Sequence, residues 1–254
     1  MQSEIKTGAD EGWQVMIPIK KGAAPEGLIQ LHREAANEGL SPEEAYNKLR
    51  GPLKSRVRRS LVEEQGGLCA YCMCRIPRTD ATPQIKPIIM EHIIPRNPID
   101  GRDVGQGLDY ENLVAVCHGN KAPRSEKRSS EDFTCDAHRG NIEFRKVNPC
   151  KPETLTTIFY TLDGKISATD ADVKFDLVDT LNLNCPSAPL VAERKSALDS
   201  LIDMINMRKD DELPEYCSNV LKAFQEETTQ KTPYVGILIW YLQTMIDSFN
   251  GESA

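Results

Sequence analysis

Apolar residues spaced three and four positions apart occur towards both ends of the chain and indicate amphipathic helices. In the helix expected over residues 53–65, Leu53, Val57 and Leu61 form the buried stripe. The Ser-Pro-Glu-Glu sequence of residues 41–44 is a capping box, which predicts a helix starting there. Similar patterns, with prolines at several starts, predict further helices over residues 26–37, 187–208, 213–227 and 233–249.

Between these helical parts the pattern changes to short β-strands. Residues 88–93 are apolar and β-branched, and residues 109–116 form a second segment that returns along the first. A short helix is expected from Cys135. A hairpin over 154–168 is expected to turn at Asp163-Gly164. The prediction is therefore an α+β, mostly helical protein.

Composition divides the 254 residues into three parts. Residues 1–50 form an N-terminal arm with short helices, 51–150 a central domain, and 151–254 a hairpin plus a helical region. The formal net charge is −7, but residues 51–150 carry 16 Lys/Arg against 13 Asp/Glu. A basic middle between acidic flanks fits local contact with phosphate, with the flanks facing solvent or a protein partner.

Five of the eight cysteines lie within residues 69–135. The N-terminal residues lack the apolar core of a signal peptide, so we expect a cytoplasmic, reduced protein. The longest apolar run, 235–245, is shorter than the ~20 residues that a membrane span needs, so no membrane contact is expected. Clustered cysteines in a reducing compartment are more often metal ligands than disulfides.

The spacing Cys69-x-x-Cys72 places two thiolates on one tight turn, as in structural zinc sites. Cys117 and Cys135 are the expected second pair, with the 17 residues between them as an insertion. Cys74 in place of Cys72, and His118 in place of Cys117, remain open alternatives. The competing interpretation is a set of buried cysteines without metal.

Phosphodiester hydrolysis needs an activated water molecule, a cation against the developing charge and stabilisation of the leaving oxygen. His92 is the best candidate for a general base, since a neutral imidazole can accept a proton from water near pH 7. Glu91 precedes it, and a bend in the strand would let both side chains reach one site. A histidine on an apolar strand can also be structural.

The order of Cys69/Cys72, Glu91-His92, Asn112 and Cys117/Cys135 resembles that of HNH endonucleases over roughly residues 53–146. The resemblance implies a small, zinc-stabilised ββα-metal unit between the N-terminal arm and the C-terminal helices. It also implies that Glu91 binds a catalytic Mg²⁺ or Mn²⁺ ion. Asn112 would clamp the loop that carries the base.

The third motif position departs from the family pattern, which usually has His or Asn there. Asp136 occupies it by register, and His138 fits it by residue type. Positions two apart on a helix face in different directions, so one of them is expected to face the metal. Arg139 stands where the family often has a residue that contacts phosphate.

Basic residues suggest where a nucleic acid could bind. Those of the helix over 53–65 could follow a phosphate backbone, and the alternative is a solvated helix face. They are Lys54, Arg56, Arg58 and Arg59. A second basic group lies in the insertion and comprises Lys121, Arg124, Lys127 and Arg128.

The flanking sequence, including the Leu-Asn-Leu-Asn of residues 181–184 and Arg194, resembles HNH proteins encoded beside retrons and the nuclease subunit of Septu anti-phage systems (PtuB). This implies an anti-phage effector with a PtuA-like ABC-type ATPase partner, and a retron reverse transcriptase with its RNA–DNA hybrid as a further partner. The alternative from another functional class is a non-catalytic zinc module that binds nucleic acid or protein. The sequence leaves open whether the substrate is DNA or RNA, including tRNA.

Overall fold

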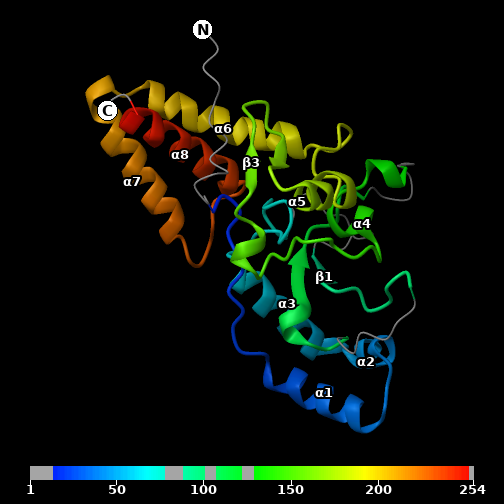
Figure 1. Cartoon of the computed structure of the whole chain (residues 1–254). Helices are drawn as coiled ribbons and strands as arrows, with labels where there is room; N and C mark the ends of the chain where they lie inside the picture. Colours follow the sequence, from blue (N-terminus) through cyan, green and yellow to red (C-terminus); the bar gives the residue numbers. More distant parts are fainter. Residues whose placement is uncertain (1–13, 78–87, 101–106, 122–128, 252–254) are drawn as a thin grey trace.

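The computed structural model describes residues 14–77, 88–100, 107–121 and 129–251 (Figure 1). It is α+β and mostly helical, as the sequence predicts. The helices are α1 Glu26–Asn37, α2 Pro42–Lys48, α3 Gly51–Glu64, α4 Cys135–Arg139, α5 Ala171–Phe175, α6 Leu190–Asn206, α7 Leu213–Glu226 and α8 Val235–Gly251. The strands are β1 Ile89–His92, β2 Leu113–Val116, β3 Ile158–Tyr160 and β4 Ile166–Ala168.

Strands β1 and β2 pair antiparallel, with His92 opposite Leu113, and α4 follows them in the chain. All four residues of β2 are buried. The side chain of Gln65, just after α3, bonds to both the backbone N–H and the carbonyl of Ala115, each at 2.7 Å. This amide satisfies backbone groups of β2 that β1 does not reach, and so ties α3 to the strand.

Helix α2 begins where the sequence predicts a helix start. The Ser41 hydroxyl accepts from the backbone N–H of Glu44, and the Glu44 carboxylate accepts from the backbone N–H of Ser41. Upstream of α1, the Lys21 ammonium donates to Glu64 on α3 at 2.9 Å and to the Leu113 carbonyl at 3.0 Å. The segment before α1 is thereby attached to both α3 and β2.

The C-terminal part contains the predicted hairpin, β3 and β4, and then α6, α7 and α8, which lie together in Figure 1. The first half of α8 is buried, so α8 is a core helix. The residue just before α8 is attached to the segment that contains Cys69 and Cys72, because the backbone N–H of Tyr234 donates to the Met73 carbonyl at 2.9 Å. In the described parts of the chain, none of the helices has the length and apolar character that crossing a bilayer requires.

One hydrophobic cluster contains residues from all three predicted parts, among them Val15, Val57, Leu177 and Leu238. The described parts of the chain therefore share one core, and the division at residues 50 and 150 remains a prediction about sequence character. The sequence did not predict α5 and the π-helical turn after it, Asp176–Thr180. Asp176 is fully buried there and accepts three backbone N–H groups from residues 145–147.

Candidate metal centre and catalytic cavity

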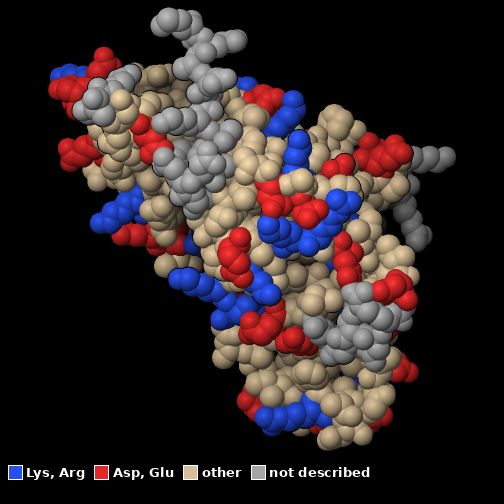
Figure 2. All heavy atoms as spheres, in the orientation of Figure 1, with Lys and Arg blue, Asp and Glu red and all other residues tan. Residues whose placement is uncertain are grey.

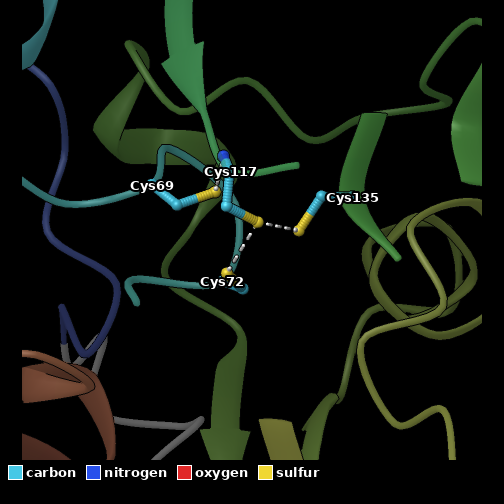
Figure 3. Close-up of side chains that lie close together, drawn as sticks. All are labelled: Cys69, Cys72, Cys117 and Cys135. Atoms are coloured by element: carbon cyan, nitrogen blue, oxygen red, sulfur yellow. Dashed lines mark hydrogen bonds between the residues drawn. The ribbon is translucent and has the colours of Figure 1, made fainter. Parts of the chain in front are cut away.

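Cys69, Cys72, Cys117 and Cys135 converge in the interior, with their sulfurs within 4.8 Å of one another (Figure 3). The Cys72–Cys117 sulfurs are 3.8 Å apart and the Cys117–Cys135 sulfurs 3.7 Å. A tetrahedral zinc ion with Zn–S bonds of about 2.3 Å would hold its sulfurs about 3.8 Å apart. The four thiols are therefore positioned to hold a metal ion of this kind.

Contacts within the cluster lower the pKa of some thiols and raise that of others. The backbone N–H of Cys117 donates to the Cys69 sulfur at 3.4 Å. Hydrogen bonds from the Cys117 and Cys135 thiols lower the pKa of Cys72 to about 6. Contact with the Cys117, Cys69 and Cys72 thiols raises the pKa of Cys135 well above its ordinary value. A thiolate is the form that binds metal, so the contacts at Cys72 suit a metal ligand.

Hydrogen bonds hold together the two ends of the segment between Cys117 and Cys135. The backbone N–H of Thr134 donates to the Gly119 carbonyl at 3.0 Å, and the Asn120 side chain donates to the Asp132 carbonyl at 2.8 Å. A Cβ on Gly119 would lie 2.2 Å from the Thr134 carbonyl oxygen, so only glycine fits this approach. Residues 119–120 and 132–134 are thus held side by side.

The C-terminal region also holds the segment that ends at Cys135. The backbone N–H of Cys135 donates to the Leu181 carbonyl at 2.8 Å. The Asn182 amide donates to the carbonyls of Glu131 and Phe133, each at 2.9 Å. The Leu-Asn-Leu-Asn segment of residues 181–184 therefore holds Cys135 in place.

The two open alternatives for the cysteine set have different positions. Cys74 is buried, and contact with the Cys117, Cys69 and Cys72 thiols raises its pKa well above the ordinary value. The group whose sulfurs lie within 4.8 Å of one another contains neither Cys74 nor His118. The geometry favours Cys72 and Cys117 as members of the set.

Both Glu91 and His92 line a cavity of about 310 Å³. Asp136 of α4 lines it as well. Burial raises the pKa of Glu91 well above its ordinary value, and the neighbouring Asp136 carboxylate raises it further. Two carboxylates that repel each other in one cavity are a suitable oxygen ligand pair for a divalent cation such as Mg²⁺.

His92 is 4% exposed, and a hydrogen bond to backbone fixes one of its ring nitrogens. Its Nε2 lies 3.0 Å from the Gly107 carbonyl, which can only accept, so Nε2 carries the hydrogen and Nδ1 carries the lone pair. Burial lowers the pKa of His92 to about 4. The imidazole is therefore neutral at pH 7, and it lines a cavity that two acidic side chains share.

Asn112 bonds twice to the loop that follows β1. Its Oδ1 accepts from the Ile94 backbone N–H at 2.7 Å, and its Nδ2 donates to the Ile94 carbonyl at 2.9 Å. Its backbone carbonyl also accepts from the Ile93 N–H at 2.9 Å. The side chain thus pins the chain immediately after His92, the position that the family resemblance implies.

Arg139 does not have the place that a phosphate-binding residue would have. It is 1% exposed, and its guanidinium donates to Glu91 at 2.6 Å and to the backbone carbonyls of His92, Ile93 and Ile142. It also donates to the Tyr71 hydroxyl at 3.2 Å. With its N–H groups engaged inside the protein, Arg139 is a buried clamp on β1, so the expectation of phosphate contact was wrong.

The two candidates for the third motif position diverge as expected for positions two apart. Asp136 lines the cavity with Glu91. The Nδ1 of His138 instead lies 3.0 Å from the Thr180 carbonyl, on the π-helical turn. His138 therefore attaches α4 to the C-terminal region, and the geometry favours Asp136 as the partner of Glu91.

The basic residues of α3 are divided between cavity and surface. Lys54 lines the cavity, Arg56 and Arg59 are exposed, and Arg58 is half-buried. Of the second basic group, Arg124, Lys127 and Arg128 lie outside the described residues. On the face drawn in Figure 2, basic and acidic side chains are interspersed.

Tyr46 and Arg96 line the cavity, although the sequence did not predict a role for either of them. Tyr46 of α2 packs edge to face against His92, with ring centroids 5.0 Å apart. Arg96 lies over the Tyr46 ring at 4.2 Å and also lines the cavity. An arginine four residues after the candidate base was a possible signal, but nothing local in the sequence placed Tyr46 there.

No family model matches this chain. The chain is 24% identical over 196 residues to an Escherichia coli protein named "Retron Ec83 putative HNH endonuclease". The match covers 66% of this chain and 74% of that protein. The chain is therefore distantly similar to a protein that carries the name of an HNH endonuclease.

Proposed function

We propose that this protein is a metal-dependent HNH endonuclease that hydrolyses phosphodiester bonds in DNA or RNA. One observation carries the proposal: a neutral histidine and two carboxylates, His92, Glu91 and Asp136, line one cavity. The name of its distant relative supports the same activity.

In the proposed reaction, His92 accepts the proton of the attacking water at Nδ1. The Gly107 carbonyl holds the imidazole in the required tautomer, and the low pKa keeps it neutral. Asn112 and Arg139 position the base, because both hold backbone next to His92.

Glu91 and Asp136 would hold the catalytic Mg²⁺ or Mn²⁺ ion, which supplies charge stabilisation at the phosphate and the leaving oxygen. Arg139 forms a 2.6 Å ion pair with Glu91, and this ion pair fixes the orientation of the Glu91 carboxylate. Cys69, Cys72, Cys117 and Cys135 would hold a structural Zn²⁺ ion, whose binding contributes to folding free energy.

The proposed setting is anti-phage defence linked to a retron. The name of the distant relative associates that protein with a retron. The proposed partners are a PtuA-like ABC-type ATPase and a reverse transcriptase with its RNA–DNA hybrid, and the proposed location is the cytoplasm. We propose that the C-terminal region provides the docking surface for the ATPase.

Incubation of the zinc-loaded protein with plasmid DNA and with total RNA, with and without its genomic neighbours, tests the activity. Cleavage should require added Mg²⁺ or Mn²⁺ and should be lost in Glu91→Gln, while zinc content stays at one ion per chain. If nucleic acid is bound but never cut, and a second ion has no effect, the non-catalytic zinc module is the better description.

A further inference from the structure

The walls of the catalytic cavity carry opposite charges. The lining includes two acidic side chains, Glu91 and Asp136, and two basic ones, Lys54 and Arg96. Both cationic side chains lie against the same aromatic ring, with Lys54 Nζ 4.7 Å and the Arg96 guanidinium 4.2 Å from the centroid of Tyr46. One tyrosine therefore holds two cations that come from separate parts of the chain.

The same ring contacts the candidate base. Tyr46 and His92 meet edge to face, with ring planes inclined by 72°. Burial raises the pKa of Tyr46, so the ring is neutral and presents its π face to the cations. His92 thus has the Gly107 carbonyl on one nitrogen and the Tyr46 ring beside it.

Helix α2 contacts the chain that follows His92 at two points. The Asn97 amide donates to the Glu43 carboxylate at 3.1 Å. A Cβ on Gly107 would come within 2.0 Å of the Pro42 carbonyl oxygen, so the chain at Gly107 lies directly against the start of α2. The position of Tyr46 is therefore coupled to the carbonyl that orients His92.

From these contacts we infer that Tyr46 is a positioning residue of the catalytic cavity. It aligns Lys54 and Arg96 as a binding wall for the substrate's phosphate groups, in the same cavity as the two carboxylates, and it packs His92 in place. The inference rests on the proposed nuclease function and extends it to α2, a helix outside the ββα unit. The ligand class is a nucleic-acid backbone that spans the cavity, with one phosphate beside the carboxylates and a neighbouring phosphate on the cationic wall.

The variants Tyr46→Ala, Tyr46→Phe and Arg96→Gln test this role by steady-state cleavage of a labelled oligonucleotide. Tyr46→Ala should raise KM about tenfold and lower kcat about tenfold, since both the cationic wall and the base lose support. Tyr46→Phe keeps the ring and should restore both constants to near wild type. Arg96→Gln should raise KM and leave kcat within about threefold.

Tyr216→Ala is the matched control. Tyr216 also carries an arginine over its ring, Arg208 at 4.6 Å, but it does not line the cavity. The positioning role is supported if Tyr46→Ala and Tyr216→Ala lower Tm by similar amounts and only Tyr46→Ala has a cleavage defect. Kinetic constants for Tyr46→Ala that match those of Tyr216→Ala would overturn it.

Binding separates this inference from the activity itself. In the His92→Ala protein, fluorescence anisotropy with labelled DNA and RNA oligonucleotides should show about tenfold weaker binding after Tyr46→Ala or Arg96→Gln, and no change after Tyr216→Ala. Absence of cleavage by the wild-type protein would refute the proposed function. Equal binding by all these proteins would refute the phosphate wall.

Discussion

The sulfurs of Cys117 and Cys135 lie 3.7 Å apart, although 17 residues separate the two cysteines in the chain. The Gly119–Thr134 hydrogen bond closes the intervening segment at its base, and the Leu181 carbonyl fixes Cys135 from the other side. The insertion therefore leaves the geometry of the cysteine set intact, and the C-terminal region takes part in building it.

Substitution of one cysteine should show which thiols bind zinc. Cys72→Ser should lose stoichiometric zinc and unfold at a markedly lower temperature, because metal binding is part of the folding free energy of such sites. Cys74→Ser, the neighbour outside the set, should keep one zinc ion per chain. Metal analysis by mass spectrometry and thermal denaturation measure both, and zinc loss from Cys74→Ser with retention in Cys72→Ser would reverse the assignment.

Gly119 and Gly39 offer a matched test of the close approach between Gly119 and Thr134. Both have positive φ, 64° and 67°, but of the two only Gly119 would bring an added Cβ against neighbouring atoms, at 2.2 Å from the Thr134 carbonyl oxygen. Gly119→Ala should cost about 2–4 kcal/mol and weaken zinc retention, whereas Gly39→Ala should cost about 1 kcal/mol. Urea denaturation gives both values, and equal losses would mean that the close approach at Gly119 is unimportant.

Replacement of Arg139 should damage the fold more than it damages nucleic-acid binding. Arg139→Gln leaves Glu91 and several buried carbonyls without their donor, so we expect a loss on the order of 3 kcal/mol. Arg59→Gln, at an exposed site on α3, should change stability by less than about 0.5 kcal/mol. Chemical denaturation of both variants checks this, and a stable Arg139→Gln protein with weakened DNA or RNA binding would restore the phosphate-binding role.

The burial of His92 predicts a pH-dependent stability. The folded-state pKa of about 4 lies below the ordinary value of 6.5, so between these values the unfolded chain binds a proton that the folded protein does not. Lowering the pH from 7 to 5 should therefore destabilise the wild type by on the order of 1–2 kcal/mol relative to His92→Gln, in the zinc-loaded form. Parallel pH dependence of the two proteins in urea denaturation would mean that His92 titrates normally.

Local patterns in the sequence were enough to predict most of the elements. The capping box at Ser41, the helices α1 and α6 to α8 and the hairpin at Asp163-Gly164 all follow from residues close together in the chain. The convergence of the four cysteines was predictable as well, because CxxC spacing and cysteine clustering indicate a shared ligand set.

The features that the sequence did not predict depend on contacts between residues far apart in the chain. Arg139 looked like a surface cation, yet it is buried because Glu91 and three carbonyls of the chain supply its acceptors. Tyr46 enters the cavity only because α2 packs against the loop at Gly107. No periodicity within one segment reports such pairings, and the π-helical turn held by buried Asp176 escaped prediction for the same reason.

Cleavage by His92→Ala compared with His138→Ala tests the central claim most directly. His92 lines the cavity with both carboxylates, whereas His138 Nδ1 pairs with the Thr180 carbonyl. With Mg²⁺ and the substrate that the wild type cuts, His92→Ala should lose cleavage by at least about 100-fold while remaining folded and zinc-bound, and His138→Ala should retain it. Wild-type rates in His92→Ala would contradict the account.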